Sequence, residues 1–128
     1  MGSYRELAVW RRAMDLAEEA YRLSKGFPKV EEYRLTSQLL RAAISVPANI
    51  AEGRARSGRK EFLNFLSIAS GSLAETETLL VLSVRTGLAS RQSTGLALDM
   101  ADEVGRMLTA LKRTLRRDMG RPSPSPEA

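Results

Sequence analysis

Apolar side chains recur every three to four positions along most of this chain, which is the spacing of the buried stripe of an amphipathic α-helix. Glycine, proline and serine interrupt the pattern, so it predicts four helices joined by short connections. Their predicted spans are about 4–25, from between 30 and 35 to 53–55, 59–86, and from a cap at Ser90 to about 119. No run of alternating apolar and polar residues predicts a strand. The expected fold is all-α, an up-down-up-down antiparallel four-helix bundle over residues 1–119, followed by a disordered Pro/Ser tail over residues 120–128.

Serines and glycines set the predicted helix ends. Ser3 precedes the first helix and Ser90 the fourth, and a serine oxygen can accept a hydrogen bond from an otherwise unpaired N–H of the first turn. Gly26 and Gly87 follow the first and third helices, where glycine suits the position just after a helix end. These signals leave connections of only a few residues, so consecutive helices are expected to run antiparallel.

The second predicted helix contains a proline, Pro47, at a position that a helix interior does not favour. Proline has no N–H to donate and its ring presses on the carbonyl of Ala43, which costs about 3 kcal/mol in an ordinary helix. The apolar spacing nevertheless runs through Pro47 without changing phase, which favours one kinked helix held by its neighbours. The alternative is two shorter helices, with Ser45 as the N-cap of the second and Pro47 in its first turn.

The third predicted helix has more apolar residues than one buried face requires. An apolar stripe fills one side, and residues 79–82 (Leu-Leu-Val-Leu) then surround a whole turn. A core-facing helix places about three positions in seven on its apolar face. The excess favours burial against a second copy of the chain; the alternative is that this helix lies centrally in its own bundle.

Composition narrows the possible chemistry. The chain has 128 residues, which suits one domain with a core that needs no disulfide or metal. It has no cysteine and no histidine, which removes thiolate metal sites and histidine-based acid–base catalysis. The N-terminus has no long apolar run, and no segment approaches the roughly 20 apolar residues of a membrane span. We therefore expect a cytoplasmic protein with no membrane partner.

Positive charge is concentrated in two places, although the net charge is only +5. In an up-down-up-down bundle, the connection between the second and third helices lies at the same end as the end of the fourth helix. Cations favour the dipole at a helix C-terminus but not at the start of the third helix. The basic residues at this end form the predicted nucleic-acid-binding surface, with a merely solvated face as the alternative. They are Arg54, Arg56, Arg59, Lys60, Lys112, Arg113, Arg116 and Arg117.

Several polar and small residues fall on faces that we expect to be packed, and we assign them a structural role. Asn49 and Glu52 are predicted to satisfy carbonyls freed by the proline or to bond across to Ser72. Gly71 is predicted to be a point of close approach between helices. Bundles can hold paired metals through Glu-x-x-His motifs, but without histidine no metal, cofactor or catalytic site is expected. The predicted structural motif comprises Pro47, Asn49, Glu52, Gly53, Gly71, Ser72 and Glu75.

Several ungapped blocks resemble one protein family. They are SVPANIAEG (45–53), the preceding TSQLLRAA, the later KEFLNFLSIASGSLAETETLL (60–80), and LAVWRRAM (7–14). Their order and spacing are similar to those of the four-helix-bundle proteins encoded by intervening sequences of bacterial 23S rRNA genes, over about residues 4–89. The resemblance implies a four-helix bundle that assembles as a homopentamer and associates with RNA.

A related branch comprises the accessory variability determinant proteins of diversity-generating retroelements. The resemblance implies that these are also basic pentameric bundles, which bind a reverse transcriptase and nucleic acid. The blocks in this chain are more similar to the intervening-sequence branch. The expected function is that of a non-enzymatic, homopentameric accessory protein associated with RNA or another nucleic acid. The alternative is a protein-interaction scaffold, for example a reverse-transcriptase accessory subunit, without direct nucleic-acid binding.

Overall fold

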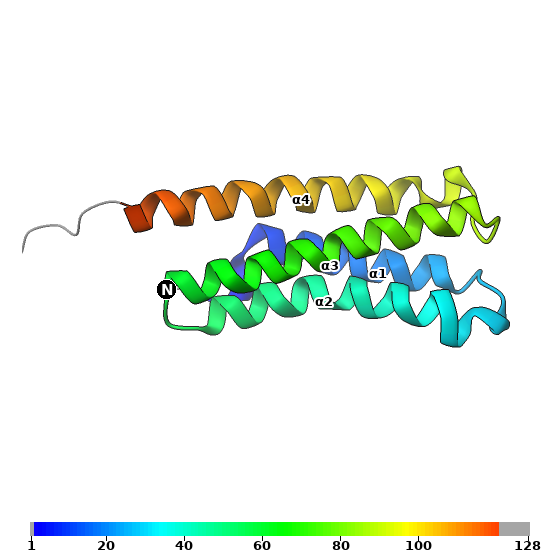
Figure 1. Cartoon of the computed structure of the whole chain (residues 1–128), viewed down its shortest axis with the longest axis horizontal. Helices are drawn as coiled ribbons and strands as arrows, with labels where there is room; N and C mark the ends of the chain where they lie inside the picture. The colour runs from blue at the N-terminus through cyan, green and yellow to red at the C-terminus, as the bar shows by residue number, and fades with distance from the viewer. Residues whose placement is uncertain (1, 121–128) are drawn as a thin grey trace, which may run out of the picture.

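A computed structural model of the chain describes residues 2–120, and over that range it contains helices and short connections but no strand (Figure 1). The predicted all-α four-helix bundle is confirmed. The helices are α1 (Ala8–Ser24), α2 (Ser37–Ala55), α3 (Arg59–Arg85) and α4 (Arg91–Gly120). A 3₁₀ turn, η1 (Tyr4–Glu6), precedes α1, and a 3₁₀ turn η2 (Lys29–Glu31) and a π-helical turn η3 (Glu32–Thr36) precede α2.

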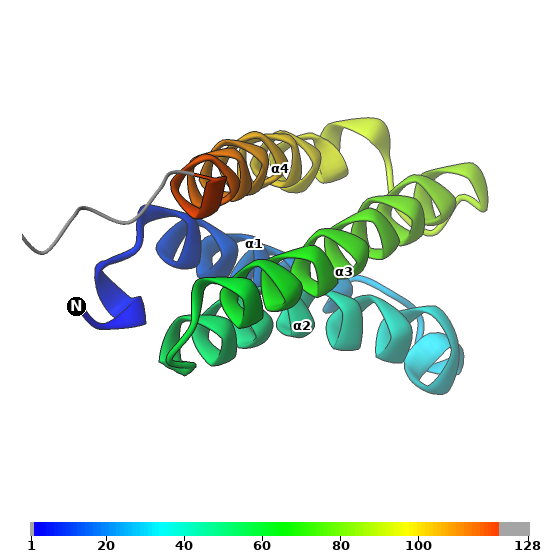
Figure 2. The ribbon, with the colours of Figure 1, turned by 60° about the vertical axis from the view of Figure 1, so that its left-hand side comes forward.

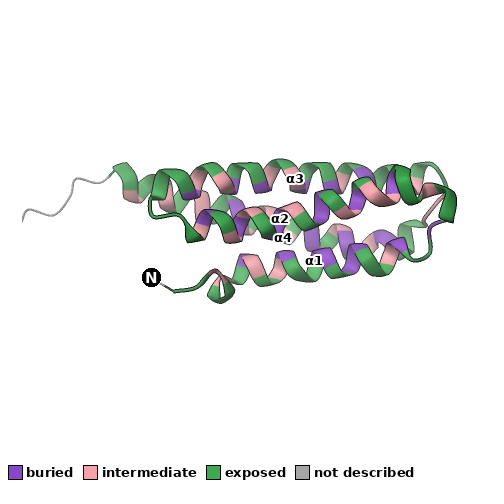
Figure 3. Ribbon diagram, turned by 90° about the horizontal axis from the view of Figure 1, so that it is seen from below, coloured by how far each residue is buried: buried purple, intermediate pink, exposed green. Residues whose placement is uncertain are grey.

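Each helix packs against the helices next to it in sequence, and α4 also packs against α1, so the four helices surround one core. Figure 3 shows that the buried residues line the inward faces of the helices. The start of the chain, the α2–α3 turn and the end of α4 lie at one end of the bundle (Figure 1), as expected. The largest fully buried apolar side chains come from all four helices: Leu16, Leu39, Ile50, Leu66, Leu80 and Leu108.

The second helix continues through its proline. Ser37–Ala55 is one helix with Pro47 buried inside it, so the prediction of a single helix is confirmed and the two-helix alternative is wrong. Ser45 is not an N-cap. Its hydroxyl lies 2.8 Å from the hydroxyl of Ser72 on α3, so this residue joins α2 to its neighbour two residues before the proline.

Two helix starts differ from the prediction. The first helix does not run continuously from Tyr4, because Leu7 is extended (φ −73°, ψ 123°) and separates η1 from α1. Ser3 therefore caps η1 rather than α1, and its hydroxyl accepts a hydrogen bond from the backbone N–H of Arg5 at 3.2 Å. Before α2, Arg34 is non-helical (φ −115°, ψ −107°), and the regular α-helix begins only at Ser37.

The remaining helix ends follow the prediction in part. Gly87 has a left-handed φ of 79° and closes α3, as expected. Gly26 has no positive φ, because the chain leaves α1 through a right-handed turn at Lys25. Ser90 caps α4: its hydroxyl accepts from the backbone N–H of Ser93 at 2.9 Å, and the Ser93 hydroxyl accepts from the N–H of Ser90 at 3.1 Å. Of the predicted tail, residue 120 belongs to α4, and residues 121–128 lie outside the described residues.

The point of close approach between helices is Gly53, not Gly71. A Cβ added to Gly53 would lie 2.6 Å from the Cβ of Phe65 and 3.1 Å from Cδ1 of Phe62. The helices α2 and α3 can pack this closely only because residue 53 has no side chain. Gly71 is exposed, and no heavy atom lies within 4 Å of the corresponding position. The prediction for Gly71 was wrong because this residue lies on the outward face of α3.

The apolar excess of α3 is only partly used inside the bundle. Leu79 and Leu80 are buried, whereas Val81 and Leu82 remain 45% and 43% exposed. Within the described residues, α3 is the one helix with the length and hydropathy for a membrane span, a test that core helices of soluble proteins also pass. Its buried side supplies Phe62, Leu66, Ala69, Leu73, Leu79 and Leu80 to the common core, so the rest of its apolar surface faces outward.

The contact at Gly53 predicts that even a methyl group is harmful there. Gly53→Ala should destabilise the protein by about 1–3 kcal/mol, because the new Cβ overlaps the Phe65 Cβ and α2 and α3 must separate. Gly95→Ala on α4 is the matched control: nothing lies within 4 Å of its Cβ position, so the change should stabilise by about 0.5–1 kcal/mol. Urea unfolding measures both. Equal effects of the two substitutions would contradict the close approach.

Candidate functional site

The predicted cationic residues all lie in the part of the bundle that contains the chain start, the α2–α3 turn and the last turns of α4. We call this part the basic end. The α2–α3 turn brings Arg54 and Arg56 close in sequence to Arg59 and Lys60, and the second group extends from Lys112 to Arg117 in α4. Figure 2 shows the α2–α3 turn and the end of α4 on opposite sides of this end. The two groups thus share one end without forming a single compact cluster.

Two of the predicted cations are held by the protein itself. Nε of Arg54 donates to the backbone carbonyl of Gly2 at 3.2 Å, and its guanidinium lies 5.9 Å from the centre of the Phe62 ring. Arg56 donates to Oε1 of Glu52 at 2.9 Å and lies 5.2 Å from the centre of the Phe65 ring. Both guanidiniums therefore cover aromatic side chains of α3, and part of their role is to close the α2–α3 seam.

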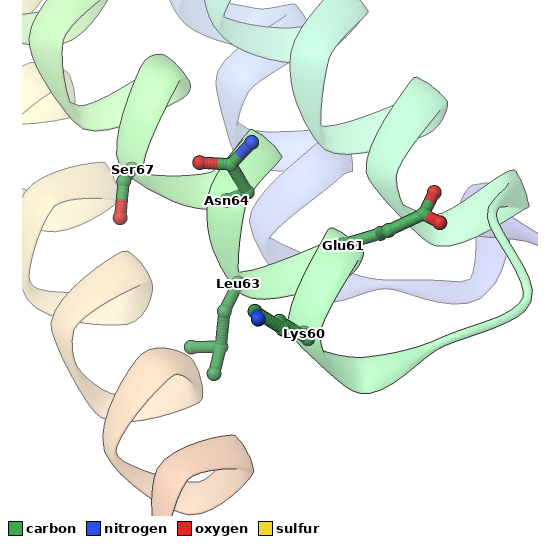
Figure 4. A pocket seen from close by; sticks show the side chains of 5 residues that line it. All are labelled: Lys60, Glu61, Leu63, Asn64 and Ser67. Carbon is green, nitrogen blue, oxygen red and sulfur yellow. The ribbon is translucent and has the colours of Figure 1, made fainter.

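Arg59 and Lys60 are exposed at the start of α3, and within residues 2–120 neither takes part in an ion pair. They add positive charge to the positive end of the helix dipole, an arrangement that disfavours folding but strengthens the attraction for an anion. Lys60 also lines an open groove of about 470 Å³ along α3. Figure 4 shows Leu63 and Ser67 of this groove directed towards α4, while Glu61 points away from them.

The basic residues of α4 have different roles. Lys112 is half-buried and its Nζ donates to the hydroxyl of Ser70 at 2.8 Å, so it joins α4 to α3. Arg113 lines a second groove between the same two helices. Arg116 and Arg117 are exposed in the last turns and form no ion pair with any residue from 2 to 120. The sequence indicated the cluster but not this division, because partners such as Ser70 lie far away in the chain.

The predicted polar motif is present but connected differently. Nδ2 of Asn49 donates to the backbone carbonyl of Ser45 at 2.8 Å and to its hydroxyl at 2.9 Å. Asn49 therefore bonds to Ser45 and not to the carbonyl of Ala43, which is the one that Pro47 leaves without its usual donor. Ser45 rather than Asn49 makes the bond to Ser72. Glu52 is exposed and pairs with Arg56, so its predicted place in this network was wrong. The reason is distance along the helix: Glu52 lies seven residues, or about 10 Å, beyond Ser45, the residue that contacts Ser72.

Glu75 is exposed and lines a polar groove of about 550 Å³ between α2 and α3. The other lining residues are Gln38, Arg41, Ala42, Ser45 and Ser72. Within residues 2–120, no three Asp or Glu side chains converge in a way that could hold a metal ion. The polar groups in this groove can hydrogen-bond a ligand or a partner side chain, but they contain no nucleophile paired with a base.

Glu77 is the carboxyl group whose environment is most clearly perturbed. It lines the α3–α4 groove together with Asp102, which forms an ion pair with Arg106 at 3.3 Å. Burial raises the pKa of Glu77 above its ordinary value of 4.5, and the nearby charge of Asp102 raises it further. The folded state therefore binds a proton more tightly than the unfolded chain does, and the ionised form of Glu77 opposes folding.

Because the pKa of Glu77 is raised in the folded state, the free energy of unfolding should fall as the pH rises through that pKa and Glu77 loses its proton. Glu77→Gln should increase the melting temperature at neutral pH, because the amide carries no charge to desolvate. The gain should shrink in acid below 4.5, where the native glutamate is also protonated. Thermal unfolding across this pH range tests it, with Glu18→Gln at an exposed site of α1 as control. A gain that does not change with pH would contradict the assignment.

The comparisons with known proteins agree with this architecture. The chain matches the profile of the 23S rRNA-intervening sequence protein family over residues 5–110. It is similar to the crystal structure of a protein of unknown function from the S23 ribosomal protein family of Bacteroides thetaiotaomicron. The TM-score is 0.77 and the identity 27%, over 82% of this chain and 98% of that chain. No curated protein matches. Because the family profile extends from α1 through most of α4, this chain belongs to the 23S rRNA-intervening sequence protein family.

Proposed function

We propose that this protein is a non-enzymatic, self-assembling bundle, a homopentamer as the family resemblance implies, that associates with RNA through its basic end. The observation that carries the proposal is the state of Arg59 and Lys60. Both are exposed at the positive end of a helix dipole, and neither is neutralised by a carboxylate among residues 2–120. Such an arrangement costs stability unless an anion binds there.

The chemistry of this end suits contacts to phosphates rather than to bases. The aromatic side chains nearby are occupied: Phe62 is buried, Phe65 lies under Arg56, and Tyr4 packs edge-on against Trp10 with ring centres 5.2 Å apart. No ring is left as a stacking platform in the described part of this end. Binding should therefore depend steeply on salt and weakly on sequence. Several copies in one assembly would raise the avidity further.

A second candidate function is protein interaction without nucleic acid, for example with a reverse transcriptase. The observation that favours it lies at the opposite end of the bundle. Val30 and Tyr33, in the connection before α2, are 65% and 88% exposed. Tyrosine is enriched among residues that dominate protein–protein binding. We assign the protein to the cytoplasm, as expected for either function from the absence of cysteine.

The phosphate proposal predicts a specific charge-reversal effect. Arg59→Glu combined with Lys60→Glu should weaken binding to an RNA hairpin at least about tenfold. It should also lower the slope of log affinity against log salt by about 1 for each phosphate that the variant no longer neutralises. A mobility-shift titration at several salt concentrations measures both quantities.

Arg91→Glu combined with Lys29→Glu is the matched control. It makes the same change in net charge at the opposite end, and Arg91 is the first residue of α4 just as Arg59 is the first of α3. The control should bind RNA with little change. Equal losses in both double variants would mean that only net charge matters, and no loss in either would remove the basic end as the binding surface.

A further inference from the structure

We propose that RNA lies as a single strand, and not as a duplex, along the groove between the first turns of α3 and the last turns of α4. The inference rests on the RNA binding in the proposed function, and it identifies the path of the RNA and the kind of RNA that fits. We call this groove the strand groove. One of its walls is the facing side of α4, and the other is formed by four residues of α3: Lys60, Leu63, Asn64 and Ser67 (Figure 4).

The first observation is a half-buried cation with an incomplete set of partners. Nζ of Lys112 donates to the hydroxyl of Ser70 at 2.8 Å, and Ser70 donates its own hydrogen to the carbonyl of Leu66 at 3.1 Å. An ammonium group has three N–H donors, and within residues 2–120 Lys112 has no second acceptor and no carboxylate partner. A partly desolvated charge without a counter-ion opposes folding, so Lys112 favours an anion at this point between α3 and α4.

The second observation is a line of cations that continues from Lys112 along the strand groove. The bond between Lys112 and Ser70 sets the register of the two antiparallel helices, and each residue adds about 1.5 Å towards the basic end. Arg116 then lies about 6 Å beyond Lys112, near the height of Ser67. Lys60 lies about 15 Å beyond Lys112, on the α3 wall. Arg116 is turned from Lys112 by only about 40° about the axis of α4, so both side chains are on the side that faces α3.

Carboxylates do not neutralise this line of cations. Lys60 and Arg116 are exposed, and neither forms an ion pair with any residue in the described part of the chain. Glu61 lies beside the groove, but Figure 4 shows its side chain pointing away from α4. Asp118 follows on α4, where it is turned from Lys112 by about 120°. The groove therefore joins the cations of the α2–α3 turn to those of α4 by a continuous positive path.

The width of the strand groove and the spacing of its cations select a single strand. The axes of packed helices lie about 8–10 Å apart, so a groove between two of them is narrower than an RNA duplex. The successive cations are separated by unequal steps of about 6 and 9 Å. The rotatable backbone of a single strand can adjust to such steps, whereas a duplex holds its phosphates at fixed positions.

The remaining groups of the groove suit the same ligand. The hydroxyl of Ser67 and the amide of Asn64 form no hydrogen bond with any residue from 2 to 120. They can therefore bind phosphate oxygens or the 2′-hydroxyl of a ribose. The half-buried Leu63 offers an apolar surface to unpaired bases without distinguishing one base from another. A strand in this groove would thus be bound mainly through its backbone.

Strand preference is the first test. Fluorescence anisotropy compares a labelled oligouridine of about twelve nucleotides with a blunt RNA duplex of the same length. If only net charge mattered, the duplex would bind more tightly, because its charges follow one another at about 1.7 Å along the axis against about 3.4 Å for one strand. The native protein should instead bind the single strand at least about tenfold more tightly, since only this probe reaches all the cations of the groove. Equal or tighter binding of the duplex would overturn the inference.

A pair of adjacent arginines tests the path of the strand. Arg116→Gln should raise the dissociation constant for oligouridine about fivefold at about 0.1 M salt, and lower the slope of log affinity against log salt by about 0.7, because one phosphate contact is lost. Arg117→Gln is the matched control: it removes the same charge from an exposed neighbour that is turned from Lys112 by about 140°. The control should change the dissociation constant less than about twofold. Equal effects of the two substitutions would overturn the path.

A steric variant tests the same groove without altering charge. Ser67→Met should weaken oligouridine binding while the melting temperature is kept, because the longer side chain enters the groove from an exposed position. Thr114→Met on α4 is the control, since this exposed residue is turned from Lys112 by about 160°. The control should keep the native affinity. Native affinity in the Ser67 variant, or equal losses in the two variants, would overturn the location.

The outcomes separate this inference from the proposed function. A native protein that binds neither probe overturns RNA binding itself, and the inference with it. If the double charge reversal at Arg59 and Lys60 weakens binding while Arg116→Gln and Ser67→Met do not, the basic end remains the RNA-binding surface and only the strand groove is overturned. Losses in all three variants, together with a preference for the single strand, would support both.

Discussion

The packing of α2 against α3 is the constraint on which the rest of this structure depends. At Gly53 the backbone of α2 lies so close to the Cβ of Phe65 on α3 that even a methyl group on residue 53 would not fit. Two residues before the proline, Ser45 joins the same pair of helices through the hydrogen bond between its hydroxyl and that of Ser72. These contacts hold α2 against α3 on both sides of Pro47, which is itself buried inside the helix, so α2 continues through the proline although the carbonyl of Ala43 loses its usual donor.

The same packing decides what the positive charges do. A connection of only three residues, 56–58, joins α2 to α3, so the cations on both sides of it stay at one end of the bundle. Those on the α2 side lie over the rings of Phe62 and Phe65 and help to close the seam. Those on the α3 side extend into solvent without a carboxylate partner in the described residues. The cations of this turn look alike in the sequence, but Arg54 and Arg56 stabilise the contact between α2 and α3, whereas Arg59 and Lys60 are available to an anionic ligand.

Most of the helices could be predicted because their signals are local. The apolar period, the serine cap of α4 and the glycine after α3 each act within a few residues, and all three appear in the structure. The starts of α1 and α2 were misplaced for a different reason. Leu7 and Arg34 depart from helical geometry without any proline or glycine at those positions, so nothing in the local sequence marks the break.

The sequence by itself determined that the chain is helical, how many helices it forms, and that its cations gather at one end, because periodicity, capping and chain order depend on neighbouring residues alone. Only the tertiary structure decided which glycine lies at a helix contact and which faces open space. It also decided that Ser45 rather than Asn49 reaches Ser72, and which cations are held by partners. The physical reason is rotation about the helix axis: each residue turns the side chain by about 100°. A small rotation of a helix about its own axis thus moves a side chain from the contact between two helices into the solvent.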